Sequence, residues 1–189
     1  MPVPAVRGLV AAIIPVDDLE RAHRADVLQW LSSTDDIYRR RKPATPPKHL
    51  VCYTVLADPE DGALFLVDRR LAGLALPPGG HVEPGEDPAG TVRREAMEEL
   101  GLEADLSIAG TRPMFVTVTR TGGLDGGHTD VSLWYVIAGD RKASIRLDER
   151  EFSGGRWWTT AEIESASPAG FDPHLGRFAA KLRPVLRRA

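Results

Sequence analysis

The stretch from Gly80 to Leu102 constrains this 189-residue chain more than any other part of its sequence. It places three carboxylates, Glu95, Glu98 and Glu99, at positions i, i+3 and i+4, so a helix gathers them on one face. Like charges at this spacing destabilise an isolated helix by roughly 0.2–0.5 kcal/mol per pair. The spacing therefore indicates a bound cation that offsets the repulsion, and hard divalent cations prefer carboxylate oxygens.

Local signals predict where this helix begins and ends. Asp87 is expected to cap its N-terminus, Pro88 suits the first turn, and Gly101 stands where a left-handed residue ends a helix. Residues 76–80, just before the stretch, include paired glycines that let the backbone approach a ligand closely. Loop, capped helix and acidic cluster together predict a site for divalent cations and phosphate.

These residues also match a family pattern. The signature G-x5-E-x7-R-E-U-x-E-E-x-G-U, with U aliphatic, is typical of the Nudix hydrolases, and Ala96 at its first aliphatic position is smaller than usual. The resemblance implies a Nudix α/β/α sandwich, in which a mixed sheet lies between helices. The chain resembles the signature at Gly80, Glu86, Arg94, Glu95, Glu98, Glu99, Gly101 and Leu102.

The resemblance implies a role for each of these side chains. Glu95, Glu98 and Glu99 would hold Mg²⁺ or Mn²⁺ and act in catalysis, and the carbonyl of Gly79 would join them as a ligand. Arg94 is expected to pair with Glu86 and so brace the loop. Three close carboxylates should raise one another's pKa in the absence of metal, which couples metal binding to deprotonation.

The chain is expected to contain one main domain. We predict an N-terminal helical extension with a Pro-rich linker over residues 1–47, a Nudix hydrolase domain over 48–166, and a C-terminal helix over 167–189 that packs on the domain. Asp17 or Asp18 is expected to cap a helix of the extension, and a second short helix to start near Thr34. The net charge of −3 gives no reason to expect nucleic-acid binding, and packing of the extension on the domain or on a second subunit is favoured over DNA binding.

The remaining chain shows strand signals and two helix signals. A short capped helix is expected at residues 159–162, and a closing helix at 172–187, bent by Pro184. The glycine-rich segment 121–130 is expected to be a mobile loop that closes over a substrate. Strands are expected over residues 50–57, 63–68, 114–120, 131–138 and 155–158.

Several residues outside the acidic helix are candidates for the site. Arg69 and Arg70 are expected to reach the phosphates or to be solvated at the surface. Trp157 and Trp158 point to opposite faces of a strand, so one is expected in the core and the other, Trp158 by preference, to stack on a base. His128, together with Asp130, is a candidate for contact with phosphate or metal; an ordinary polar role in the loop is the alternative. Glu151 is the first choice for the general base, ahead of Glu149, because the family position before Trp157, acidic in some nucleotide hydrolases, is Arg156 here.

Composition excludes some classes of protein. The one cysteine, Cys52, excludes an internal disulfide framework and a cysteine-based zinc cluster, and its apolar neighbours predict a buried strand position. No apolar run is long enough to span a membrane, and no signal-peptide pattern is present, so a cytoplasmic location is expected. The sequence leaves open whether the protein is a monomer or a homodimer.

The expected reaction is metal-dependent hydrolysis of the diphosphate linkage in a nucleoside diphosphate derivative. A nucleoside triphosphate or related nucleotide is the default substrate, and the absence of asparagine excludes reading a base with an asparagine side chain. One alternative is a non-catalytic nucleotide sensor with the same fold. A less favoured one is an isomerase of the isopentenyl-diphosphate type, which requires a catalytic cysteine that Cys52 is poorly placed to supply.

Overall fold

The computed structural model of the chain describes residues 1–41, 45–70, 73–122, 127–166 and 170–187. The chain divides into two compact units, each assembled from three segments. The first unit contains residues 1–53, 80–92 and 111–135, and the second contains residues 54–79, 93–110 and 136–189. Residues 43–44 of the predicted linker and 123–126 of the predicted glycine-rich loop lie outside the described residues.

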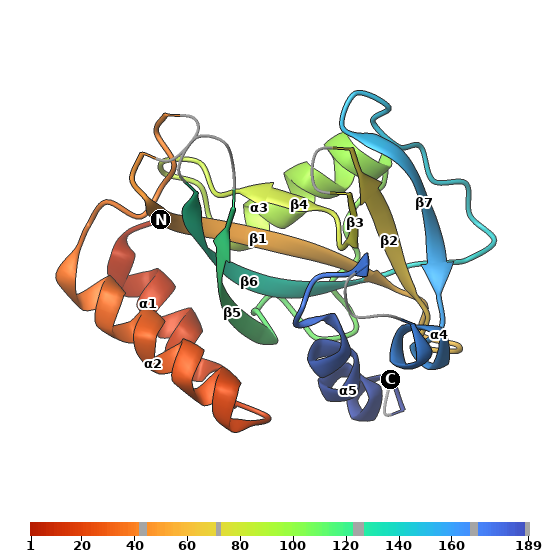
Figure 1. Cartoon of the computed structure of the whole chain (residues 1–189), viewed down its shortest axis with the longest axis horizontal. Helices are drawn as coiled ribbons and strands as arrows, with labels where there is room; N and C mark the ends of the chain where they lie inside the picture. Colours follow the sequence, from red (N-terminus) through yellow and green to blue (C-terminus); the bar gives the residue numbers. More distant parts are fainter. Residues whose placement is uncertain (42–44, 71–72, 123–126, 167–169, 188–189) are drawn as a thin grey trace. The chain divides into compact units, whose positions relative to one another are not determined.

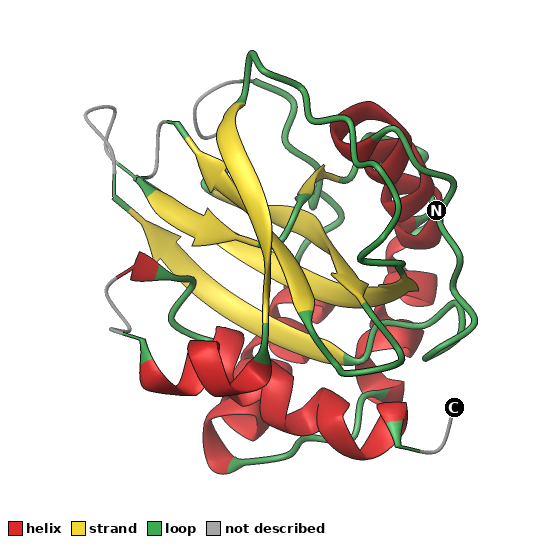
Figure 2. Cartoon of the chain, turned by 90° about the vertical axis from the view of Figure 1, so that its right-hand side faces the viewer, coloured by secondary structure: helices red, strands yellow, loops and turns green. Residues whose placement is uncertain are grey.

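The strands, drawn in yellow in Figure 2, form a seven-stranded sheet accompanied by helices, in agreement with the predicted fold class. They are hydrogen-bonded in the order β3-β2-β1-β6-β5, with β4 beside β1 and β7 beside β2. Each predicted strand is present. The strands are β1 (Lys48–Ala57), β2 (Leu64–Arg69), β3 (Leu74–Leu76), β4 (Gly79–His81), β5 (Phe115–Thr121), β6 (His128–Ala138) and β7 (Phe152–Trp158).

The N-terminal helices belong to the first unit. Helices α1 (Val3–Ala12) and α2 (Asp18–Ser33) lie side by side, as Figure 1 shows, and α2 also contacts β5. The side chain of Asp17 accepts the backbone N–H of Glu20 at 2.7 Å, so the predicted cap of α2 is confirmed.

The predicted second short helix near Thr34 was wrong. Residues 34–41 contain no helix, because Ile37 is fully buried and its carbonyl accepts the backbone N–H of Leu50 in β1 at 2.8 Å. Burial of Ile37 and its hydrogen bond to β1 therefore hold this segment in a non-helical form.

The second unit is organised around β2. This strand pairs antiparallel with β3 and with β7, and its register slips between Asp68 and Arg69 opposite β7. Helix α4 (Thr160–Ser165) starts with a complete capping box between Thr159 and Glu162, as the sequence predicts, and contacts α5 (Leu175–Leu186), which contains Pro184. Within the described part of the chain, no helix has the length and apolar character to cross a membrane.

Candidate active site

The acidic residues lie on a helix that changes its winding among them. Helix α3 (Pro88–Glu95) begins at the predicted proline and continues as the π-helical turn η1 (Ala96–Leu100). The turn ends at Gly101, whose φ of 66° is the left-handed conformation expected of a terminating glycine. A π turn inside a helix is rare and is frequent at functional sites, and no feature of the sequence signalled it.

Glu99 is the most enclosed of the three glutamates. Its side chain is 7% exposed, and its carboxylate accepts the backbone N–H of Gly79 at 2.6 Å and the guanidinium of Arg69 at 3.2 Å. The same guanidinium donates to the carbonyl oxygen of Gly79 at 3.2 Å. Gly79 and Glu99, two of the predicted metal ligands, are therefore in direct contact.

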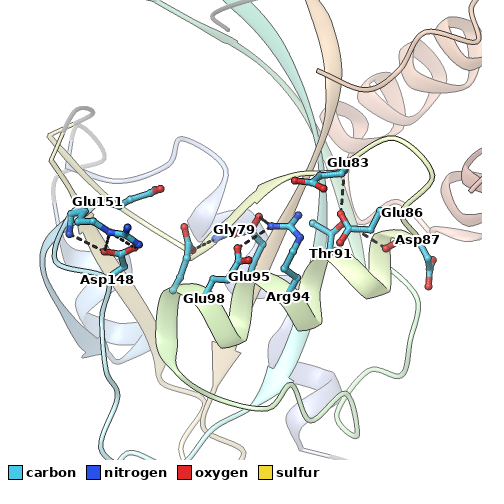
Figure 3. A network of polar contacts seen from close by, with 12 residues as sticks. Gly79, Glu83, Glu86, Asp87, Thr91, Arg94, Glu95, Glu98, Asp148 and Glu151 are labelled. Atoms are coloured by element: carbon cyan, nitrogen blue, oxygen red, sulfur yellow. Dashed lines mark hydrogen bonds and ion pairs between the residues drawn. The ribbon is translucent and has the colours of Figure 1, made fainter. Parts of the chain in front are cut away.

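The other two glutamates, Glu95 and Glu98, both pair with the side chain of Arg94. Arg94 donates to the carboxylates of Glu95 at 2.7 Å and Glu98 at 3.1 Å, and Figure 3 shows these three side chains together on the helix. Exposure separates the pair, since the side chain of Glu95 is 9% exposed and that of Glu98 is 59% exposed. The site thus combines two enclosed carboxylates with one that faces solvent.

Burial makes ionisation of the enclosed glutamates unfavourable. Desolvation, followed by the charge of Glu95, raises the pKa of Glu99 from its ordinary value of 4.5 to about 8, although Arg69 and the Gly79 N–H act in the opposite direction. Desolvation also raises the pKa of Glu95, against the influence of Arg94. A divalent cation would add positive charge beside these two carboxylates and so favour their ionised forms.

A register slip between β2 and β7 lies beside Arg69. Asp68 pairs with Gly154 and Arg69 pairs with Phe152, so Ser153 of β7 is the extra residue at this irregularity. The guanidinium lies 3.6 Å from the carboxylate of Glu151, over the ring of Phe152, while it also contacts Glu99. Arg69 therefore lies between the buried glutamate and the predicted general base.

The segment before β7 is held by its own polar contacts, drawn in part in Figure 3. Asp148 pairs with Arg150 through both carboxylate oxygens, and this pairing lowers the pKa of Asp148 to about 2. Its carbonyl accepts the backbone N–H of Glu151 at 3.1 Å. Its backbone N–H donates to the carbonyl of Glu99 at 3.3 Å. Asp148 thus connects the acidic helix to the chain segment that carries Glu151, a link that the sequence analysis missed.

Glu86 belongs to the first unit and is surrounded by its own loop. Its carboxylate accepts the hydroxyl of Thr91 at 2.7 Å and the backbone N–H of Glu83 at 3.1 Å (Figure 3). These bonds brace the turn before α3. Arg94 belongs to the second unit, and its predicted pairing with Glu86 stays a prediction.

A cavity of about 520 Å³ in the second unit contains three of the predicted substrate-binding residues, Arg69, Arg70 and Trp158. Arg70 uses its Nε atom to donate to the carbonyls of Glu149 and Phe152, so it holds the chain before β7. The ring of Trp158 packs against the ring of Phe171 and under the guanidinium of Arg156, 3.2 Å from the ring centroid. Neither Trp157 nor Trp158 is fully buried, which differs from the expectation that one of them is core.

The fourth predicted substrate-binding residue, His128, lies in the first unit. It begins strand β6 and Asp130 follows in the same strand, so neither residue belongs to a loop, contrary to expectation. The strand brings the ring of His128 onto that of His49, with ring centroids 4.9 Å apart, and the ring centroid of His81 lies 4.8 Å from that of His49. The sequence analysis overlooked His49 and His81.

The chain belongs to the Nudix family, because a family model described as NUDIX domain matches residues 47–182. This finding confirms the predicted family. The rat (Rattus norvegicus) diphosphoinositol polyphosphate phosphohydrolase 2 is 36% identical over 59 residues, which cover 31% of this chain and 33% of that protein. The alignment therefore spans about a third of this relative.

Solved structures show the same fold. The E. coli dihydroneopterin triphosphate pyrophosphohydrolase has a TM-score of 0.55 at 16% identity, covering 81% of this chain and 99% of that one. The MutT protein from Methanosarcina mazei Go1 has a TM-score of 0.53 at 19% identity, covering 74% and 93%. At these identities the structural matches show the fold alone.

Proposed function

We propose that this chain is a divalent-metal-dependent hydrolase that cleaves the diphosphate linkage of a nucleoside diphosphate derivative, with a nucleoside triphosphate or related nucleotide as its substrate class. The observation that carries the proposal is the enclosure of Glu95 and Glu99 together, with Glu99 bonded to Gly79. Burial opposes the ionisation of both carboxylates. Two such buried groups reduce the stability of the fold, so a purely structural role does not explain them. A binding site for a hard cation explains both the burial and the all-oxygen donor set.

The donor set fits Mg²⁺ or Mn²⁺. Glu95, Glu98, Glu99 and the carbonyl of Gly79 would hold the ion, which would neutralise charge on the diphosphate and lower the pKa of the attacking water. The names of the relatives agree with this chemistry, since one acts on a diphosphoinositol polyphosphate and another on dihydroneopterin triphosphate.

The chain's own residues supply positioning and proton transfer. Glu151, half-exposed and close to Arg69, is our choice for the base that orients water and takes its proton. Arg69 donates to Glu99 and forms an ion pair with Glu151 at 3.6 Å, and its charge faces the region where the diphosphate would bind. The adjoining cavity, within the 300–1,000 Å³ range of ligand sites, would take the attached group, with Trp158 as its aromatic wall.

A hydrolysis screen tests this proposal. Purified protein with Mg²⁺ would be given nucleoside triphosphates, ADP-ribose, NADH, dinucleoside polyphosphates, nucleotide sugars and a diphosphoinositol polyphosphate, and products would be separated by chromatography. We expect the unmodified protein to cleave one class of these diphosphate compounds. The Glu98→Gln substitution is expected to lower turnover of that class by orders of magnitude. Tight nucleotide binding without release of phosphate or pyrophosphate would instead support the non-catalytic sensor.

A further inference from the structure

A second group of metal-ligating side chains lies in the first unit, apart from the glutamates of the second. His49 comes from β1, His81 from β4, and His128 and Asp130 from β6. Each offers one ligand atom, and the four atoms all lie within 4.8 Å of one another. Three of the five histidines of the chain thus converge on one carboxylate.

The distances match those between ligands of one metal ion. The Nε2 atom of His49 lies 3.0 Å from Nε2 of His81 and 3.1 Å from Oδ1 of Asp130. Nε2 of His128 lies 3.3 Å from the same oxygen. Ligands held tetrahedrally at zinc–nitrogen distances of 2.0–2.1 Å are roughly 3.3 Å apart. The widest pair in the group would have to close by about 1.5 Å to reach that separation.

The proton on His49 points away from the group. Nδ1 of His49 lies 2.9 Å from the carbonyl oxygen of Pro46, which can only accept, so Nδ1 carries the proton. In the neutral ring Nε2 therefore presents a lone pair to His81 and Asp130. Donation of the second ring nitrogen to a carbonyl is the usual way in which a protein orients a metal-binding histidine.

Asp130 supplies an independent sign of a missing partner. Its Oδ1 atom is buried and makes no hydrogen bond to any described residue, although two imidazole nitrogens lie within 3.3 Å. A buried carboxylate oxygen without a donor is unfavourable unless a cation is bound to it. His49, which faces this oxygen, is fully buried.

From this geometry we propose that a binding site for a transition-metal ion is formed by His49, His81, His128 and Asp130. Zn²⁺ is the preferred ion, and its ligands would link strands β1, β4 and β6. Three imidazoles and one carboxylate suit Zn²⁺ and its neighbours, whereas Mg²⁺ prefers oxygen ligands. Four protein ligands complete a tetrahedral shell, and a closed shell is typical of a structural site. The ion therefore differs in its preferred ligands from the one assigned to the glutamates, which belong to the other unit.

Metal binding to chelator-treated protein tests this inference. Zn²⁺ is titrated calorimetrically in excess Mg²⁺, which occupies the glutamates, and Co²⁺ is added in parallel because its visible absorption reports tetrahedral coordination. His128→Gln and Asp130→Asn are the test variants, since these side chains are partly exposed. Glu98→Gln and His23→Gln are the matched controls, and circular dichroism checks that each variant is folded.

We expect one Zn²⁺ per chain in the unmodified protein and in both controls, with a tetrahedral Co²⁺ spectrum. Loss of one ligand should weaken Zn²⁺ binding at least 100-fold in folded His128→Gln and in folded Asp130→Asn. Equal Zn²⁺ affinity in the unmodified protein and the test variants would overturn the proposal. Loss of binding in Glu98→Gln, or an octahedral Co²⁺ spectrum in the unmodified protein, would do the same.

Discussion

Replacing Glu99 by glutamine should stabilise the chelator-treated protein, and increasingly so as the pH rises. The folded protein raises the pKa of this carboxyl from 4.5 to about 8, mainly because the group is buried. A raised pKa means that the favourable contribution is complete below about pH 4.5 and is lost as the pH rises through about 8. Glutamine carries no charge to bury and keeps an oxygen that can accept the N–H of Gly79.

The magnitude follows from the shift in pKa. Each pKa unit corresponds to about 1.36 kcal/mol, so burying the ionised form of Glu99 costs about 5 kcal/mol above pH 8 and about 3 kcal/mol at pH 7. The pKa of about 8 already includes the opposing effect of Arg69, and below that pH Arg69 faces an uncharged acceptor in both proteins. The change with pH, about 3–4 kcal/mol between pH 5 and pH 8, is therefore the diagnostic quantity.

Urea denaturation with a chelator present, at pH 5, 6, 7 and 8, measures this quantity. Ionisations far from residue 99 cancel in the difference between their free energies of unfolding, whereas that of Glu95, whose charge is coupled to Glu99, remains part of it. Glu98→Gln is the matched control, because it removes one carboxylate from the same helix at a side chain that is 59% exposed. A flat difference for Glu99→Gln, within about 1 kcal/mol over the same range, would refute the reasoning.

Three further predictions rest on other parts of the site. Mg²⁺ affinity, measured by calorimetry, should rise up to tenfold per pH unit between pH 6 and about 8, because Glu99 must lose its proton to bind; pH-independent affinity would contradict this. Asp148→Ala should lower kcat and leave KM within about threefold, because the Asp148 carboxylate accepts the backbone N–H and the guanidinium of Arg150, the residue next to Glu151; an unchanged kcat in steady-state assays would contradict it. Gly101→Ala should reduce the free energy of unfolding by about 1–2 kcal/mol, because alanine is strained at a φ of 66°; undiminished stability in urea would contradict it.

The elements that could be predicted from the sequence are those governed by local rules. Asp17, Pro88 and Gly101 mark helix ends because caps and backbone preferences act within a few residues. The family followed from the residue spacing in 80–102, and the family model confirms it. The roles given to the glutamates, to Arg69 and to Glu151 stay predictions, as do the domain boundaries at residues 47 and 166.

Other features depend on pairings between distant segments. The register slip beside Arg69 exists only where β2 pairs with β7, and no local pattern shows that pairing. His49, His81 and His128 come from three strands, and the short spacing between His128 and Asp130 was the one local sign of their group. The short helix expected near Thr34 failed because burial of Ile37 outweighed local helix signals.

The most direct test of the central claim compares the activity of two variants, Glu99→Gln and Glu103→Gln. The rate of Mg²⁺-dependent hydrolysis is measured for each on the best substrate from the screen. Glu103 is an exposed glutamate four residues after Glu99, so its variant controls for the loss of one charge nearby. The account predicts a loss of at least 100-fold in kcat for Glu99→Gln and near-normal turnover for Glu103→Gln. Near-normal turnover of folded Glu99→Gln would contradict the assignment of the buried glutamates to catalysis.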